Sequence, residues 1–230
     1  MAKRTKTKRT GGALGPGYGA GEITNQVVER YMMSLLPARD EVLAKIEKQA
    51  SRRDIPIVGP AVGRVLHLLA QMIAARRVFE LGSAVGYSTI WWARAVGATG
   101  RVVYTDGDPK KAAEAQGYFE RAGVAERIDV RVGDALKILA ADKGEYDIIF
   151  CDIDKVGYPE ALKLAMPRVR RGGLIVADNV LYSARVTLPA RQQNANTKGI
   201  VAFNRTLNGS KEFFTTILPI RDGVAVARKL

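Results

Sequence analysis

The sequence of 230 residues predicts a single doubly wound α/β domain with a mostly parallel, seven-stranded sheet. A hydrophobic fraction of 47% is sufficient for one substantial core. From Arg77 onward, short β-branched runs alternate with longer amphipathic stretches, a pattern typical of βαβ units whose sheet is covered on both faces. Two further apolar runs flank Arg221 and Asp222 and predict an antiparallel hairpin at one edge of the sheet.

Three amphipathic helices are expected before the sheet, over 24–36, 38–51 and 60–75. Pro37 separates the first two helices, and Pro60 lies near the first turn of the third. Thr24 suits the N-cap of the first helix, whereas Asp40 and Glu41 suit the first turn of the second. These helices precede the sheet in the sequence.

The alternating region begins at residue 77 and predicts five parallel strands joined by helices. The strands are expected over 77–81, 101–105, 127–132, 146–151 and 173–177, the helices over 86–97, 109–122, 134–142 and 157–170, and the hairpin within 213–229. No internal repeat or linker divides the chain, so one domain is expected. We assign 1–23 to a flexible basic tail and 24–230 to this domain, with the N-terminal helices over 24–56 and the catalytic core over 57–230.

The composition favours a cytoplasmic protein without a membrane segment. No apolar stretch approaches the roughly 20 residues that span a bilayer. Gly and Pro follow the basic N-terminus where a signal peptide would carry an apolar run. Cys151 has no partner for an intramolecular disulfide, which agrees with a reducing compartment.

The net charge of +13 allows a polyanionic partner such as RNA. Five of the cations lie in the tail before Gly12, where no acidic residue accompanies them. No dense basic run follows the tail, so the remaining cations are expected to be dispersed over a solvated surface. The charge therefore does not by itself establish RNA binding.

In an open parallel sheet, ligands bind beyond the carboxyl ends of the strands, so those positions carry the functional argument. Gly82 and Gly86 follow the first strand and permit a tight turn close to a ligand. Their spacing differs from the G-x-G-x-x-G of dinucleotide folds, which makes a nicotinamide dehydrogenase a poor interpretation. Glu80, just before the turn, favours a ligand with positive charge.

Acidic residues follow the second and third strands. Asp106 lies where an acid hydrogen-bonds a ribose diol in nucleotide-binding folds. Asp106 or Asp108 could instead cap the helix that starts at Pro109, and we expect this role of Asp108 in any case. Asp134 could either cap the next helix or accept a hydrogen bond from an adenine amino group.

The fourth and fifth strands end in acids that we expect to converge. Asp152, Asp154 and Lys155 follow the fourth strand, and Asp178 and Asn179 follow the fifth. Oxygen ligands without His or thiolate suit a hard divalent cation such as Mg²⁺. Because Asp178 and Asn179 follow the next strand, we favour a metal site over the alternative that Asp152 and Asp154 are two solvated loop acids.

The ordered set "FELGSAVGYST", "YTDGDP", "GDALKIL", "FCDIDKVGY" and "VADNV" resembles the cation-dependent, S-adenosylmethionine-dependent O-methyltransferases of the catechol and caffeoyl-CoA type. The similarity extends from about Ile57 to the C-terminus. The resemblance implies a Rossmann-like fold, an enzyme, and a homodimer with the N-terminal helices as its contact. It also implies S-adenosylmethionine and Mg²⁺, or another hard cation such as Mn²⁺ or Ca²⁺, as cofactors.

The resemblance also implies roles for individual residues. It implies Lys155 as the general base, and Asp152, Asp178 and Asn179 as metal ligands. Cofactor contacts would come from Glu80, Gly82, Gly86, Ser88, Asp106, Asp134, Ala135 and Asp152. Asp154, Tyr158, Tyr182 and Arg185 are candidates beside the acceptor, although the segment 181–199 matches no acceptor signature.

The chemistry predicted from these residues is methyl transfer to a small vicinal diol, such as a catechol or a hydroxycinnamoyl ester. A diol that chelates the metal would be oriented and acidified for attack on the sulfonium methyl group. Two alternatives stay open at this point. The same site could methylate a hydroxylated uridine of tRNA, which the net charge favours, or the fold could serve as a non-catalytic binding protein.

Overall fold

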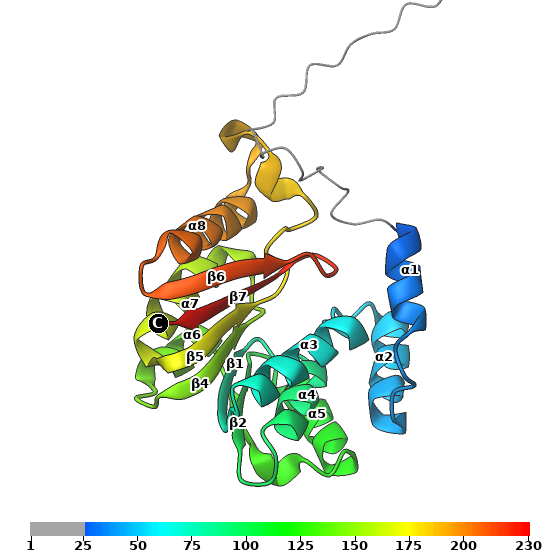
Figure 1. Cartoon of the computed structure of the whole chain (residues 1–230). Helices are drawn as coiled ribbons and strands as arrows, with labels where there is room; N and C mark the ends of the chain where they lie inside the picture. Colours follow the sequence, from blue (N-terminus) through cyan, green and yellow to red (C-terminus); the bar gives the residue numbers. More distant parts are fainter. Residues whose placement is uncertain (1–25) are drawn as a thin grey trace, which may run out of the picture.

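The computed structural model describes residues 26–230, so the predicted tail over 1–23 and Thr24 lie outside the described part. The five parallel strands are β1 (Arg77–Leu81), β2 (Arg101–Asp106), β3 (Ile128–Val132), β4 (Tyr146–Cys151) and β5 (Val169–Ala177). The predicted hairpin comprises β6 (Phe213–Leu218) and β7 (Val224–Lys229). All seven form one sheet in the order β3-β2-β1-β4-β5-β7-β6 (Figure 1). The doubly wound fold with an antiparallel C-terminal strand is confirmed, and its topological switch point lies between β1 and β4.

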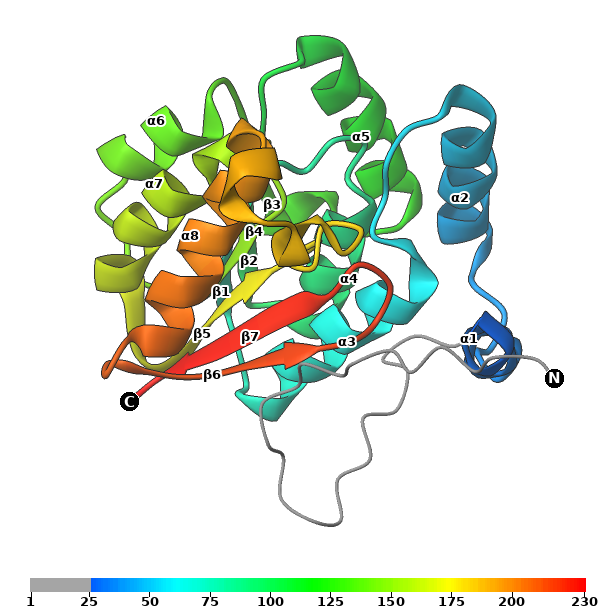
Figure 2. The ribbon, with the colours of Figure 1, turned by 90° about the horizontal axis from the view of Figure 1, so that it is seen from above.

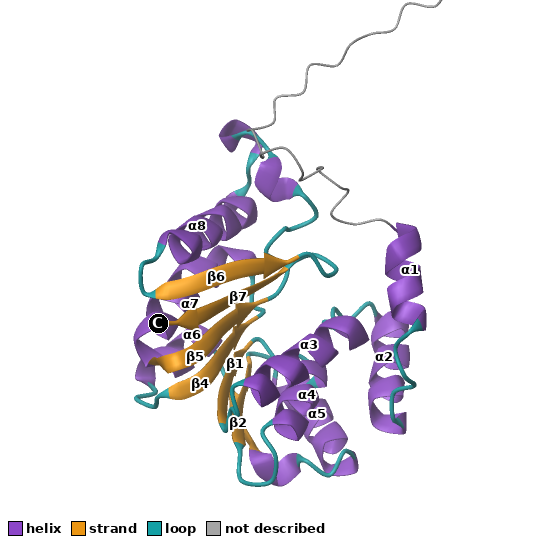
Figure 3. Cartoon of the chain, in the orientation of Figure 1, coloured by secondary structure: helices purple, strands orange, loops and turns teal. Residues whose placement is uncertain are grey.

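Helices cover both faces of the sheet (Figure 3). The first layer contains α3 (Gly59–Met72), α4 (Tyr87–Ala95) and α5 (Pro109–Arg121), and the second contains α6 (Ala135–Ala141), α7 (Tyr158–Ala165) and α8 (Ala195–Gly209). Successive strand residues point to opposite layers, so Val78 packs in the first core and Phe79 in the second. Among residues 26–230 no helix is long and apolar enough to cross a bilayer.

Two N-terminal helices, α1 (Gln26–Ser34) and α2 (Glu41–Arg53), lie beside the first layer (Figure 2). Two ion pairs tie α2 to that layer. Arg53 donates to Glu114 of α5 at 2.6 Å, and Arg94 of α4 donates to Asp40 at 2.7 Å. Leu43 and Ile46 of α2 join the buried core. This attachment places α1 and α2 beside the carboxyl ends of the strands.

Acidic N-caps begin three of the helices, as the sequence predicts for Asp108 and allows for Asp134. Asp40 accepts hydrogen bonds from the backbone amides at the start of α2, Asp108 does so for α5, and Asp134 for α6. Each cap satisfies amides that have no partner within the helix, and it stabilises the helix by about 1 kcal/mol.

The fifth strand begins four residues earlier than predicted. The helix expected over 157–170 ends as α7 at Ala165, because Pro167 cannot donate the next helical hydrogen bond. Val169 of β5 then pairs with Tyr146 of β4, and the pairing register shifts between Tyr146 and Ile148. Arg170 also forms an ion pair with Asp147 of β4, which fixes this early part of the strand in the sheet.

Helix α8 is not among the helices expected from the sequence, and it begins within the segment 181–199 that matches no acceptor signature. The helix begins after Asn194, whose side chain accepts from the amide of Thr197 at 2.9 Å. Its buried face presents Ile200, Phe203 and Leu207, which follow the helical spacing of three to four residues. Asn, Thr and Gly have weak intrinsic helix propensity, so burial of that face stabilises α8.

Candidate active site

A cavity of about 1270 Å³ opens at the carboxyl ends of the parallel strands, and its floor is formed by the loops that follow β1 to β5. The opposite wall comes from the N-terminal part of the chain, with Met33 of α1, Ala50 of α2 and the segment 54–57. The cavity therefore lies where ligands bind in doubly wound sheets, across the switch point between β1 and β4.

Gly82 permits the closest backbone approach in this cavity. Its φ is +82°, and a Cβ atom there would lie 2.5 Å from the carbonyl oxygen of Asp152. The amide of Asp152 donates to the carbonyl of Leu81 at 2.9 Å, so the ends of β1 and β4 are joined at this point. Gly86 has φ +80° and faces the ring of Phe119, which makes it a packing position behind the cavity wall.

Asp106 and Asp134 both line the cavity. The carboxylate of Asp106 accepts from the amides of Ala84 at 2.9 Å and Asp108 at 2.8 Å, which fixes its orientation. Each oxygen retains lone pairs that could accept from a ribose diol. Asp134 caps α6, and Ala135, the first residue of that helix, lines the cavity beside it. These positions are those expected for the nucleoside end of a cofactor.

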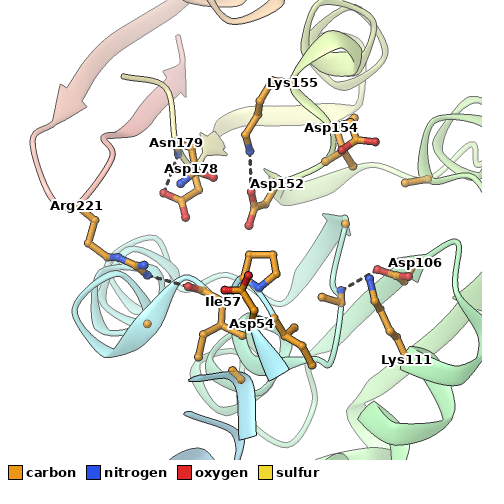
Figure 4. Close-up of a pocket in the computed structure, with 18 of the residues that line it drawn as sticks. Asp54, Ile57, Asp106, Lys111, Asp152, Asp154, Lys155, Asp178, Asn179 and Arg221 are labelled. Atoms are coloured by element: carbon orange, nitrogen blue, oxygen red, sulfur yellow. Dashed lines mark hydrogen bonds and ion pairs between the residues drawn. The ribbon is translucent and has the colours of Figure 1, made fainter. Parts of the chain in front are cut away.

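Lys155 follows β4, lines the cavity and has two hydrogen-bond partners, of which Figure 4 shows Asp152. Its Nζ donates to Asp152 Oδ1 at 2.9 Å and to the hydroxyl of Tyr158 at 2.8 Å. The Tyr158 hydroxyl in turn donates to the carbonyl of Asp178 at 2.8 Å, and the side chain is fully buried. Tyr158 therefore orients the lysine from beneath and does not line the cavity.

Asp178 and Asn179 bring the end of β5 beside Asp152 in the same cavity (Figure 4). Asp178 is only 3% exposed, and its Oδ1 accepts from the amide of Asn179 at 2.8 Å. Burial raises the pKa of Asp178 to about 7, and the negative charge of Asp152 acts in the same direction. Lys155 pairs with Asp152, whereas Asp178 forms no ion pair within residues 26–230, so a cation beside Asp178 would lower the cost of its buried charge.

This donor set fits a hard divalent ion that retains several water ligands. Asp152 and Asp178 offer carboxylate oxygens and Asn179 an amide oxygen. Over residues 26–230 no group of three His, Cys, Asp or Glu side chains is placed to hold a metal ion, so the candidate set consists of two carboxylates and one amide.

Glu80 and Ser88 lie behind the cavity wall. Glu80 is fully buried and accepts a hydrogen bond from Thr89, while its Oε1 has no partner. Burial raises the pKa of Glu80 to about 7. Ser88 is 6% exposed on α4. Neither side chain belongs to the cavity lining, so the contact of these two residues with a cofactor stays a prediction.

The acceptor candidates separate into two groups. Asp154 and Tyr182 line the cavity, whereas Arg185 does not. The Arg185 guanidinium instead lies 5.3 Å from the ring centroid of Tyr182, so it supports that ring. The backbone of Tyr182 has φ +47°. The amide of the preceding residue, Leu181, donates to the carbonyl of Asp222 at 2.9 Å, which joins this segment to the β6–β7 hairpin.

Several residues in or beside the cavity do not follow a parallel strand, so inspection of the strand ends does not identify them. Asp54, with φ +54° at the end of α2, and Arg221, in the β6–β7 hairpin, both reach the cavity (Figure 4). Gly199 of α8 packs against Lys155, where an added Cβ would lie 2.3 Å from the Lys155 carbonyl oxygen. Asn196 accepts from the amide of Val156 at 3.1 Å. These contacts join elements far apart in the sequence and carry no local motif.

The cavity is acidic although the chain is strongly basic. Three cations line it, namely Lys111, Lys155 and Arg221, against eight acids, namely Glu29, Glu47, Asp54, Asp106, Asp134, Asp152, Asp154 and Asp178. Glu47 is paired with Arg39 at 2.8 Å, and Asp152 with Lys155. The remaining excess of carboxylates favours neutral or cationic ligands over polyanions.

Comparisons with known proteins identify the family. The model of the O-methyltransferase family matches residues 34–230. The chain is 36% identical over 219 residues to a catechol O-methyltransferase of Niastella koreensis, covering 89% of this chain and 99% of that protein. It is 37% identical over 183 residues to a catechol O-methyltransferase of Mycobacterium tuberculosis, covering 78% of this chain and 81% of that protein.

Solved structures agree with this assignment. An O-methyltransferase of Bacillus cereus in complex with SAH matches with a TM-score of 0.80 and 30% identity, covering 89% of this chain and 97% of that chain. The O-methyltransferase TomG of Streptomyces achromogenes, in complex with SAM, matches with a TM-score of 0.80 and 33% identity, covering 88% and 96%. The chain therefore belongs to the O-methyltransferase family, which confirms the predicted resemblance to S-adenosylmethionine-dependent enzymes of the catechol and caffeoyl-CoA type.

Proposed function

We propose that this enzyme methylates one hydroxyl of a small vicinal diol, with a divalent cation held by Asp152, Asp178 and Asn179. The observation that carries the proposal is the convergence of these residues and Lys155 in one cavity at the ends of β4 and β5. The raised pKa of Asp178 supports a cation there, because Asp178 is buried beside a second carboxylate and forms no ion pair within residues 26–230.

Lys155 is the proposed general base. Its Nζ faces the cavity from a position fixed by Asp152 and Tyr158. In its neutral form the amine accepts the proton of the acceptor hydroxyl, and the acceptor oxygen then forms the new bond to the methyl group. S-adenosylmethionine supplies that methyl group and leaves as the neutral thioether. A bound hard cation would supply Lewis acidity that favours loss of the hydroxyl proton.

The cofactor is proposed to lie across the switch point. Asp106 would accept from its ribose, and Asp134 and Ala135 would border its adenine. Gly82 would border the methionine end, since it lines the cavity where the turn after β1 packs directly against the Asp152 backbone. The acidic character of the cavity suits a sulfonium cation.

The same charge distribution indicates the acceptor class. Within the proposed function, we infer that the acceptor is a neutral or cationic diol. A polyanion such as a CoA thioester or tRNA would meet a lining with more carboxylates than cations. Asp54 and Asp154 are two candidates for contact with a cationic acceptor, since both line the cavity, form no ion pair within residues 26–230 and have no proposed metal or cofactor role.

The test is methyl transfer from labelled S-adenosylmethionine to four acceptors: catechol, a catecholamine, caffeoyl-CoA and bulk tRNA. Each is assayed with Mg²⁺ and with EDTA. We expect the highest kcat/KM for the first two acceptors and loss of activity in EDTA. Methylation that persists at full rate in EDTA would contradict the metal site, and efficient methylation of tRNA would contradict the acceptor class.

We also propose a homodimer that uses the N-terminal helices. Tyr31, Met32 and Leu35 of this region are 63%, 49% and 63% exposed. Apolar groups at this exposure commonly mark association surfaces. Light scattering should give about twice the chain mass, and replacing Tyr31 and Leu35 with Ser should reduce it to that of one chain; an unchanged mass would contradict this contact.

A further inference from the structure

Basic residues lie at the beginning of every parallel strand. Arg77 opens β1, Arg101 opens β2, Arg127 precedes β3, Lys143 precedes β4, and Arg171 lies in the early part of β5. They are far apart in sequence, which is why no basic run appears after the tail. Parallel strands start at a common edge, so these cations gather at the edge of the sheet opposite the cavity. We call this set the basic edge.

Three of these cations lie at the starts of neighbouring strands and form a row across β2, β1 and β4. Arg77 is the direct partner of Arg101 across β1 and β2. Lys143 precedes β4, the neighbour of β1 on its other side, whereas the Arg127 side chain donates to the carbonyl of Ala93 in α4 at 3.2 Å and lies outside this row. Like charges opposite each other destabilise a sheet, so this row does not serve the fold. With neighbouring strands roughly 4.8 Å apart, the row extends about 10 Å, which is longer than one phosphate group.

A second cavity, of about 430 Å³, lies at the basic edge and is lined by Arg77, Arg101, Arg131 and Lys143. Its two carboxylates, Asp129 and Asp142, are both paired with Arg131, each at 2.7 Å. Within the described chain, Arg77, Arg101 and Lys143 form no ion pair with any carboxylate. These three cations therefore face the cavity and solvent with their charge uncompensated.

The aromatic ring of Tyr146 forms part of the same cavity. The Arg77 guanidinium lies 5.0 Å from the Tyr146 ring centroid, which orients its plane and leaves its N–H groups available. A planar guanidinium binds phosphate through two parallel hydrogen bonds. On the strands that continue the sheet, Arg171 of β5 and Arg228 of β7 are also exposed and extend the positive charge.

We propose that the basic edge binds the phosphate backbone of a nucleic acid, independently of base sequence and apart from the methyl-transfer site. A single small anion would use only part of a row that crosses three strands. A flat bilayer surface would not enter the recess beside Tyr146. The nucleic acid is a binding partner here and not the methyl acceptor, because the two cavities lie at opposite ends of the strands.

The test measures fluorescence anisotropy of a labelled 20-nucleotide poly-U RNA and a 20-base-pair DNA duplex with the full chain over 50–300 mM salt. The variant R101Q/K143Q removes two exposed charges of the basic edge. The matched control R64Q/R205Q removes two exposed charges from α3 and α8. All proteins keep the N-terminal tail, so the comparison isolates the edge.

We expect R101Q/K143Q to bind about tenfold more weakly at low salt. The salt slope on poly-U should fall by about 1.4, roughly 0.7 for each phosphate that the variant no longer neutralises. The control should change affinity less than threefold. Both variants should melt at or slightly above the wild-type temperature and retain methyl transfer to catechol, which shows that they are folded. Comparing the affinities for the RNA and the DNA duplex shows which nucleic acid the basic edge prefers.

Three results would overturn the proposal. The first is an equal decrease of affinity in both variants, which would assign binding to net charge alone. The second is absence of nucleic-acid binding by the unmodified chain at 50 mM salt. The third is tighter binding to vesicles containing phosphatidylserine than to either nucleic acid, with the same dependence on Arg101 and Lys143.

Discussion

The two ends of the parallel strands carry opposite charge in different environments. At the carboxyl end, Glu80 and Asp178 are buried, and burial raises the pKa of each to about 7. At the amino end, Arg77 and Arg101 are exposed and lie side by side without carboxylate partners in the described structure. One end concentrates negative charge in a cavity, and the other spreads positive charge over a surface.

This difference shows two ways in which a sheet can hold charge for binding. Buried like charges are expensive in free energy and need a compensating ligand within the cavity. Exposed like charges are screened by water and salt, so they are tolerated and act over longer range. We therefore expect changes at the carboxyl end to have large effects, and changes at the amino end to have small effects on the fold.

The largest effect is expected from Lys155→Met, which removes the proposed base and keeps a similar side-chain length. The rate of methyl transfer should fall by about 10²–10⁴, the usual contribution of general base catalysis. Cofactor affinity, measured by calorimetry, should change little. Lys163→Met, an exposed lysine on α7 paired only weakly with Glu160, is the control. A decrease of less than tenfold would exclude Lys155 as the base.

Glu80→Gln tests the burial of charge at the carboxyl end. A carboxyl group whose folded pKa is raised binds its proton more tightly in the native state, so its contribution to stability falls as pH rises from about 4.5 to 7. The variant should lose this part of the pH dependence, worth at most about 3 kcal/mol. Urea unfolding at pH 5 and pH 8 measures it. Equal pH dependence in both proteins would contradict the raised pKa.

Gly199→Ala tests the support of Lys155 by α8. The new methyl group would meet the Lys155 carbonyl oxygen at 2.3 Å, so the backbone must shift. We expect a decrease of about 1–3 kcal/mol in the free energy of unfolding and a lower kcat. Gly209→Ala, in the same helix with nothing within 4 Å, should be neutral or stabilising. Similar behaviour of the two variants would contradict this support.

Asp54→Asn tests whether the carboxylate of Asp54 favours a cationic acceptor over a neutral one. Asn tolerates the left-handed backbone of this position, so the fold should be kept. The ratio of kcat/KM for a catecholamine to that for catechol should fall severalfold, about 1 kcal/mol, because one carboxylate of the cavity is neutralised. Steady-state assays with both acceptors measure the ratio. The neutral acceptor serves as the internal control, and an unchanged ratio would remove Asp54 from acceptor recognition.

The smallest effect is expected from Arg101→Gln at the amino end. Removing one member of the row of cations relieves repulsion with Arg77 and should stabilise the protein by about 0.2–0.5 kcal/mol at low salt. The gain should disappear at high salt, because screening weakens the repulsion. Thermal unfolding at two salt concentrations measures both values. A destabilisation at low salt would show that Arg101 has a structural role.

The succession of strands and the residues that follow them were predictable from the sequence. Alternating apolar runs predict the sheet, and its strands bring Asp152, Lys155, Asp178 and Asn179 to one edge because parallel strands end together. Asp108 and Asp134 were identifiable as caps because a cap lies next to its own helix. These are local or periodic features, and a linear sequence displays them directly.

Which distant segments meet depended on packing in three dimensions. The fold placed Glu80 behind the cavity wall, Gly199 against Lys155, and Asp54 in the cavity. It also aligned Arg77 with Arg101, although 24 positions separate them in the sequence. Burial, register and charge balance depend on neighbours in space, so a pattern along one chain cannot specify them before the chain is packed.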